Sequence, residues 1–565
     1  MGERGGADVG IAPRPSRPLP QAPLVALALL LALLIGLAVA PTPSLDAEQA
    51  SSLLLARSLA EDGDRLWQVP DRARAERLAD DGLLAEGVVT QEEAYGDPFG
   101  GPLVYGLFLA PWAALAGARG ALLAQGLFFA AAALFAARTL AQRAGRAAAW
   151  LPSLLLMATA TGAYLLRLWP EAVLAALVML AFALVRGAEP PAAPAFDGAI
   201  PDLYPEETVA RPANFAPRWL VTGALLGAVA SAAPWTLPLL WPAAEAVPAS
   251  RRRQGVAMLL GMAALVMLAL AVTAAATANA EPRLGSLAAG LGLESPPIPR
   301  ARVLAWDLAY LAAGRHIGLV FYFAPLLLLA VLTGSGRARR ALPAAVGLSV
   351  LLLLLLRPYD LAGGSLTIGL RSLVPLAAAL CLGAVRPPSR LAWFVACGWS
   401  AAWLWPLALS PLHPFGAGGE LRYAAPYLAP WAPLETTQPA LRFGSPLRLG
   451  RGRIVLLGGE VLAGGRVASV PAGKWVEVLA GVPGGAPGFW VEGGEQSGNE
   501  LPVRGAEVTE TIFRPDGGIS FLVRPEREVA KHEMPGESRP WSFYHLSIRL
   551  PGPEGKQFTI RLRPG

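Results

Sequence analysis

The stretch LVALALLLALLIGLAVA, from Leu24 to Ala40, decides the class of this protein. It carries no charged residue, and its length approaches the ~20 apolar residues that cross a bilayer core as a helix. A backbone inside lipid must satisfy its own hydrogen bonds, so such a block is expected to be helical. Similar blocks recur at Ala121–Ala137, Leu220–Ala233, Val256–Ala278 and Leu391–Leu409. The chain is therefore predicted to be a polytopic α-helical membrane protein.

Composition supports this class. Of 565 residues, 54% are hydrophobic and 16% are charged, whereas soluble chains carry about 25% charged residues. The net charge of +6 comes largely from arginines in alternate loops between the apolar blocks, as the positive-inside rule requires of cytoplasmic segments. The charge thus indicates topology and not a nucleic-acid partner. With 2 cysteines and 4 histidines, no disulfide, metal site or cofactor is identified, although a carboxylate-bound divalent cation stays open.

Ten further helices are expected after the first, which gives about eleven transmembrane helices. A short interfacial helix is expected at Gln49–Leu59, and 102–115 is interpreted as re-entrant or surface-lying. With the N-terminus inside, every arginine cluster lies in the cytoplasm and the C-terminus lies outside. The expected later spans are 120–138, 147–166, 170–186, 218–232, 234–248, 255–279, 317–333, 341–357, 371–386 and 391–410.

The C-terminal part changes from helical blocks to alternating segments separated by glycine turns. In Trp541–Leu550, for example, Tyr544, Leu546 and Ile548 share one face, which is typical of a half-buried antiparallel strand. A β-sandwich-like domain outside the cytoplasm is the prediction. The resulting division is a disordered cytoplasmic tail (1–22), a transmembrane domain (23–410) with an outer loop (41–101), a linker (411–440) and a β-rich domain (441–565).

Ionisable residues gather on the predicted outer side. A carboxylate there can act as a general base, and arginines can hold a lipid phosphate. Each also has a plainer interpretation, because Asp46 or Glu48 can cap a helix, Glu171 can favour the helix that follows Pro170, and the arginines can snorkel at helix ends. The residues are Asp46, Glu48, Glu171, Asp307, Arg315, His316, Asp360 and Arg371.

Several short motifs, taken in order, resemble the GT-C superfamily of membrane glycosyltransferases. Ser58-Leu59-Ala60-Glu61-Asp62-Gly63-Asp64, after Asp46 and Glu48, resembles the first outer loop of the protein O-mannosyltransferases and the aminoarabinose transferases of lipid A. Leu168-Trp169-Pro170-Glu171 is similar to a turn of bacterial members, as are the Tyr310–Pro325 segment, which contains Tyr322, and the glycine-rich turn that ends at Arg371.

The resemblance implies a GT-C-like fold and transfer of a sugar from a polyprenyl-phosphate donor in the membrane lipid. The acceptor would be a glycan, lipid or protein outside a bacterial cytoplasmic (inner) membrane. The base carried over by position is Glu48 or Asp46. The remaining predicted site residues are Arg315, His316 and Arg371 for the donor phosphate, and Glu171, Asp97, Asp307 and Tyr322 at the substrate site.

The chain departs from the family pattern at three places. In the acidic pair, Ala47 separates residues that are usually adjacent. In the glycine-rich turn, Leu370 stands where Asn is usual and Ser372 where Tyr is usual, and Asp97 stands where relatives often carry His. These departures keep two alternatives open. One is a non-catalytic membrane scaffold derived from such enzymes, and the other is a transporter or lipid flippase.

Overall fold

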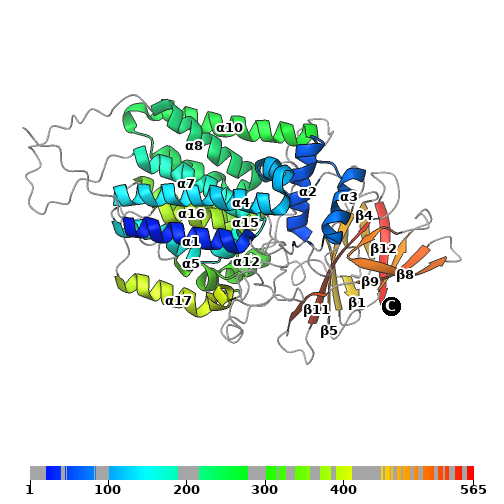
Figure 1. Ribbon diagram of the computed structural model, residues 1–565. Helices are drawn as coiled ribbons and strands as arrows, with labels where there is room; N and C mark the ends of the chain where they lie inside the picture. The colour runs from blue at the N-terminus through cyan, green and yellow to red at the C-terminus, as the bar shows by residue number, and fades with distance from the viewer. Residues whose placement is uncertain are drawn as a thin grey trace, which may run out of the picture.

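The structure is a computed structural model of the chain, shown in Figure 1. Of the residues singled out above, Asp46, Asp97, Arg315, His316 and Asp360 lie outside the described part, and Glu48 is described only as a backbone position. The linker 411–440 and nearly all of the 1–22 tail also lie outside it. The structure describes residues 21–39, 45, 47–81, 83, 99, 101–144, 146–188, 215–277, 301–314, 317–325, 337–356, 369–383 and 390–409, followed by 447–449, 452–457, 460–461, 467–471, 475–483, 489–493, 501–513, 519–525, 528–532, 541–549 and 557–564.

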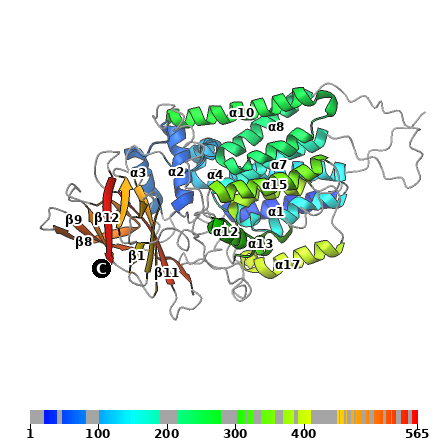
Figure 2. The ribbon, with the colours of Figure 1, turned by 180° about the vertical axis from the view of Figure 1, so that it is seen from behind.

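The N-terminal half and the middle of the chain form a helical bundle. Its long helices run side by side in both ribbon views (Figures 1 and 2), and α2 stands across one end of them. The helices are α1 (Gln21–Val39), α2 (Ala47–Glu61), α3 (Val69–Asp80), α4 (Leu103–Ala144), α5 (Leu151–Met157), α6 (Thr161–Leu165), α7 (Pro170–Ala188), α8 (Phe215–Ala232), α9 (Leu240–Glu245), α10 (Arg252–Thr277), α12 (Ala301–Ala313), α13 (Leu319–Tyr322), α15 (Arg337–Leu356), α16 (Val374–Gly383) and α17 (Arg390–Leu409), with 3-10 turns η1 (Arg146–Trp150), η4 (Pro234–Leu239), η5 (Ala249–Arg251) and η6 (Arg371–Leu373).

Three helical stretches within the described residues are long and apolar enough to cross a membrane: Gln21–Val39, Leu103–Gln142 and Ala249–Thr277. The most apolar windows of the first and third are only 22% buried inside the protein, so these helices present apolar side chains outward. Exposed apolar surface of this extent fits contact with lipid. The described helices are therefore compatible with a membrane protein.

The prediction of eleven spans was wrong. The expected span 147–166 is divided into η1, α5 and α6, and 234–248 is divided into η4 and α9. Proline explains part of this, because Pro152, Pro234, Pro238 and Pro242 cannot donate a backbone hydrogen bond within a continuous helix. Segment 102–115 also differs from the prediction, since it is the first part of the long α4. A break at Ala116 and Gly117, where Gly117 has φ +60°, separates the two parts.

Close backbone packing joins α8 to α10. A Cβ added at Gly223 would lie 2.3 Å from the carbonyl oxygen of Leu259, and one at Gly227 would lie 2.6 Å from that of Ala263. Two glycines four residues apart on one helix face allow this approach, which is common between helices in membranes. The packing is thus of a kind that membrane helices use.

The expected helix at Gln49–Leu59 is confirmed as part of α2. It packs on the first part of α4, where Gly106 leaves room for Leu55 and Leu59. A separate apolar core forms between these elements, with Leu53, Leu54 and Trp67 among its members. This core fixes α2 against the bundle.

The C-terminal strands form two antiparallel sheets in the described residues, one ordered β1-β2-β5-β11-β10 with β7 paired to β11, the other β3-β4-β12-β6-β9-β8. Leu546 and Ile548 of β11 are buried, as the alternation predicted. Figures 1 and 2 place the sheets beyond α2 and α3. The strands are β1 (Leu447–Leu449), β2 (Gly452–Leu457), β3 (Glu460–Val461), β4 (Val467–Pro471), β5 (Trp475–Pro483), β6 (Phe489–Gly493), β7 (Val503–Arg504), β8 (Ala506–Phe513), β9 (Ile519–Pro525), β10 (Glu528–His532), β11 (Trp541–Arg549) and β12 (Gln557–Pro564).

Candidate functional site

Two of the predicted site residues form an ion pair. Nε of Arg371 lies 3.4 Å from Oε1 of Glu171, and the two side chains are only 11% and 10% exposed. Glu171 is in the first turn of α7, directly after Pro170, and Arg371 opens η6. A buried charge is costly without its counter-charge, so each residue stabilises the position of the other.

The turn before Arg371 is held tightly against its neighbours. Gly369 has φ +69°, a conformation that glycine adopts without strain. A Cβ at this position would lie 3.0 Å from side-chain atoms of Ala160, Tyr322 and Phe323. The hydroxyl of Tyr164 donates a hydrogen bond to the carbonyl oxygen of Gly369, at 3.1 Å. These contacts fix the direction in which the chain enters Arg371.

Tyr322 belongs to the same assembly. Its carbonyl oxygen accepts a hydrogen bond from the backbone N–H of Ala160, at 3.2 Å. Its side chain is fully buried. The structure therefore places buried Tyr322 against the Gly369 turn, where its Cβ limits the space beside Gly369.

The start of α2 reaches the turn that leads to Glu171. Oε1 of Gln49 accepts a hydrogen bond from the backbone N–H of Leu168, at 3.5 Å, and Gln49 is almost completely buried. Glu48 precedes Gln49 in the same helix. The segment that carries the predicted base thus lies next to the turn that carries Glu171.

Gln125, which the sequence did not single out, contacts the same turn from α4. Its Nε2 donates to the carbonyl oxygen of Arg167 at 2.6 Å, and its Oε1 accepts from the hydroxyl of Tyr105 at 2.8 Å. The only available signal was one amide within an apolar block. A polar side chain buried in such a block needs partners.

Asp307 is a different kind of residue. It is fully buried on α12, and neither carboxylate oxygen has a hydrogen-bond partner among the described residues. Burial raises the pKa of Asp307 to about 7. Near neutral pH the protonated and the ionised forms of this carboxyl are therefore both populated.

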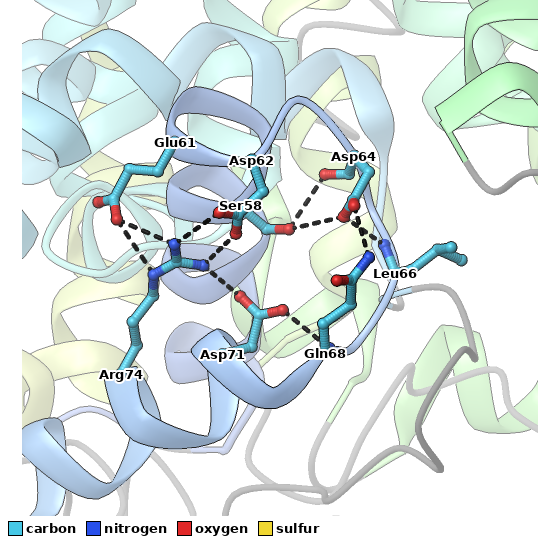
Figure 3. A network of polar contacts seen from close by, with 8 residues as sticks. All are labelled: Ser58, Glu61, Asp62, Asp64, Leu66, Gln68, Asp71 and Arg74. Carbon is cyan, nitrogen blue, oxygen red and sulfur yellow. Dashed lines mark hydrogen bonds and ion pairs between the residues drawn. The ribbon is translucent and has the colours of Figure 1, made fainter.

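A polar network joins the end of α2 to α3 (Figure 3). The guanidinium of Arg74 contacts Asp62 at 3.0 Å, Asp71 at 2.6 Å and Glu61 at 3.0 Å. The hydrogen bond to Asp62 is the main reason why the pKa of Arg74 is raised, while burial raises the pKa of Asp71. We call these four residues the Arg74 network.

The Ser58–Asp64 motif supplies two members of the Arg74 network, Glu61 and Asp62, and makes further contacts of its own. The Ser58 hydroxyl donates to Oδ1 of Asp64 at 3.1 Å, and Gly63 turns the chain with φ +75°. Asp71, at the third position of α3, accepts from the backbone N–H of Gln68, which satisfies a donor at the helix start. The motif residues that the structure describes thus close the corner between α2 and α3.

No model of a known protein family matches the chain, and no curated protein matches it. Within the described residues, no group of three or more His, Cys, Asp or Glu side chains is arranged to hold a metal ion. The candidate site is accordingly the Glu171–Arg371 pair with the three segments around it: the start of α2, the 165–169 turn, and the Tyr322 and Gly369 contact.

Proposed function

We propose that this protein is a membrane glycosyltransferase of the GT-C type, which transfers a sugar from a polyprenyl-phosphate donor to a glycan, lipid or protein. One observation carries the proposal. Glu171, 200 residues before Arg371 in the chain, pairs with it beside the α2 segment that holds Glu48. Such a reaction needs a carboxylate and a cation close together, because charge that develops in the transition state must be stabilised. Here separate segments of the chain supply them.

The reaction assigned to this site is a single displacement. Glu48 or Asp46 takes the proton from an acceptor hydroxyl, and the acceptor oxygen then bonds to the anomeric carbon of the sugar. The bond from that carbon to the phosphate oxygen breaks, and the polyprenyl phosphate leaves with the electron pair. Arg371, together with Arg315 and His316, stabilises the leaving phosphate.

Glu171 has a supporting role in this proposal. A guanidinium presents five N–H donors, so it can contact a carboxylate and a phosphate at the same time. The 3.4 Å ion pair involves Nε of Arg371, which orients the two terminal nitrogens of its planar fork. Glu171 thereby fixes the direction from which Arg371 meets the donor.

The proposed location is a bacterial cytoplasmic membrane, crossed more than once, with the site and the β-rich domain on the outer side. The arginine clusters between apolar blocks support this orientation. The sheets lie beyond α2 and α3, at the end of the bundle where Gln49 contacts the 165–169 turn. We assign the β-rich domain to positioning the acceptor at that end.

The test compares cells that carry wild-type protein, no protein, Asp46→Asn, Glu48→Gln or Arg371→Gln. Lipid-linked sugars and surface glycans are profiled at matched protein levels. We expect the deletion to accumulate a polyprenyl-phosphate sugar and to lose a surface glycan. Arg371→Gln and one of the two acidic substitutions should reproduce this. Glu76→Gln, an exposed acidic position on α3, is the matched control.

A non-catalytic scaffold is the second candidate, because Glu171 and Arg371 already satisfy each other's charge. It predicts that the deletion has a phenotype while the acidic substitutions behave as wild type. Unchanged lipid-linked sugars in the deletion, with altered flux of a solute or lipid, would instead favour a transporter or flippase.

A further inference from the structure

The turn at residues 165–169, between α6 and α7, carries backbone groups that lie outside both helices. Within it, the N–H of Trp169 donates a hydrogen bond to the carbonyl oxygen of Arg167 at 2.8 Å. Leu165 ends α6, Pro170 begins α7, and Leu168 and Trp169 are almost fully buried. Carbonyl and N–H groups at helix ends need partners, and buried ones without partners cost free energy. The hydrogen-bond partners of these backbone groups therefore determine how rigidly the turn holds Glu171, two residues after Trp169.

Gln125 satisfies the turn from α4. Its Nε2 donates to the carbonyl oxygen of Arg167 at 2.6 Å and lies 3.5 Å from that of Leu165. Tyr105 is also on α4, and its hydroxyl donates a hydrogen bond to Oε1 of Gln125. The amide can face the turn in only one orientation, because the reverse orientation would bring its oxygen against two carbonyl oxygens. The Tyr105 hydroxyl reinforces that orientation.

Gln49 satisfies the turn from α2. Its Oε1 accepts from the backbone N–H of Leu168, so the turn is contacted by a side-chain amide on each of two helices. Both glutamines are buried, at 0% and 3% exposed. Within the apolar surroundings of α4, hydrogen bonding of a buried amide is needed to offset its desolvation.

We propose that Gln49 and Gln125 are positioning residues that clamp the 165–169 turn and so set the place of Glu171, and through it Arg371, relative to Glu48. The inference rests on the proposed function, because it concerns the same site. The clamp joins the helix that carries the base to the turn that leads to the ion pair. Geometry of this kind governs the rate of a displacement more than the affinity for substrate.

The test uses the full-length protein in a membrane mimetic, with Gln125→Met, Gln49→Met and Tyr105→Phe. Methionine is similar in length to glutamine but cannot make these hydrogen bonds. Hydrogen–deuterium exchange is measured at 165–169, together with kcat and KM for release of polyprenyl phosphate. Gln142→Met, an exposed position on the same α4, is the matched control.

We expect Gln125→Met to speed exchange at Leu168 and Trp169 at least tenfold, and to lower kcat at least tenfold with KM changed less than threefold. Gln49→Met should act in the same direction. Tyr105→Phe should have a smaller effect, because Gln125 keeps its donors and loses only the reinforcement of its orientation. Gln142→Met should match the wild type.

Exchange at 165–169 decides the clamp independently of the activity. Wild-type exchange in both Gln125→Met and Gln49→Met overturns the inference. Faster exchange with unchanged kcat also overturns it, since the clamp would then not serve the site. Should Gln125→Met not fold, Tyr105→Phe and Gln49→Met decide by the same criteria. A wild-type protein that transfers no sugar refutes the proposed function, and the exchange data still decide whether the amides hold the turn.

Discussion

The Glu171–Arg371 pair and the Arg74 network use the same chemistry in opposite ways. The members of the Arg74 network lie within 14 residues of one another, from Glu61 to Arg74, and three carboxylates surround a single guanidinium. The Glu171–Arg371 pair joins residues 200 positions apart. The chain enters Arg371 through a glycine with positive φ, and two buried amides contact the turn before Glu171. The Arg74 network stabilises the corner between two consecutive helices. The Glu171–Arg371 pair forms only when segments far apart in the sequence fold against each other.

Arg371→Leu is expected to have the largest effect on this contrast. It leaves the Glu171 carboxylate buried without its counter-charge, which costs about 3–5 kcal/mol of stability, and it removes the proposed phosphate contact. Thermal unfolding in detergent and sugar transfer measure the two consequences. The double variant Arg371→Leu with Glu171→Leu should recover stability but not transfer. If transfer survives in the double variant, Arg371 does not hold the donor.

Asp307 is a buried carboxyl whose oxygens have no hydrogen-bond partner among the described residues. Its pKa of about 7 in the folded protein lies above the ordinary value of 3.8. The folded state therefore holds the proton more tightly than the unfolded state does, and stability falls as pH rises from about 4 to 7. The loss is at most about 4 kcal/mol. Asp307→Asn should match the wild type near pH 4 and be more stable at pH 8. Parallel stability curves for the two proteins would contradict this.

Arg74→Met tests the local network. The three carboxylates then repel one another, and Asp71, which is fully buried, loses its counter-charge; we expect a loss of about 2–3 kcal/mol. Faster proteolysis between α2 and α3 would report it. Arg72→Met is the control, because its ion pair with Glu76 is exposed and such pairs contribute less than about 1 kcal/mol. If Arg74→Met and Arg72→Met lower stability equally, the Arg74 network does not have this structural role.

Gly369→Ala is expected to have the smallest effect. Its positive φ and its 3.0 Å neighbours cost an alanine about 1–2 kcal/mol. Because the strain lies at the turn that leads to Arg371, transfer should fall more than stability does. Gly261→Ala, in an open position inside α10, should leave transfer unchanged and raise stability by about 0.5–1 kcal/mol.

Much of the local structure could be predicted from the sequence. The apolar blocks predicted α1 and α10, and alternation in Trp541–Leu550 predicted a strand, which the structure has as β11. The break in 147–166 was missed because hydropathy averages over a proline that interrupts a helix. Pro234, Pro238 and Pro242 already marked 234–248 as the weakest expected span, but it was still counted as one. Length and hydropathy alone therefore overestimated the number of spans.

The site could be predicted only in part. Glu171, Arg371 and Tyr322 were singled out one by one, but no local pattern indicates a contact between residues 200 positions apart. Arg74 sits on a strongly charged helix, which is typical of a solvated face, and so its network was missed. Gln125 was missed because one amide hardly alters the hydropathy of an apolar block. The roles of these side chains follow from the residues that they contact in the fold, which the residue type alone does not give.

The most direct measurement is release of polyprenyl phosphate by purified protein in nanodiscs that contain lipid-linked sugars extracted from the deletion strain, with an extract of surface acceptors added. We expect release by the wild type and by Glu76→Gln. We expect none by Arg371→Gln or by the double variant Asp46→Asn with Glu48→Gln, although each remains folded. Release by that acidic double variant at the wild-type rate would contradict the central claim that the start of α2 supplies the base to the Glu171–Arg371 site.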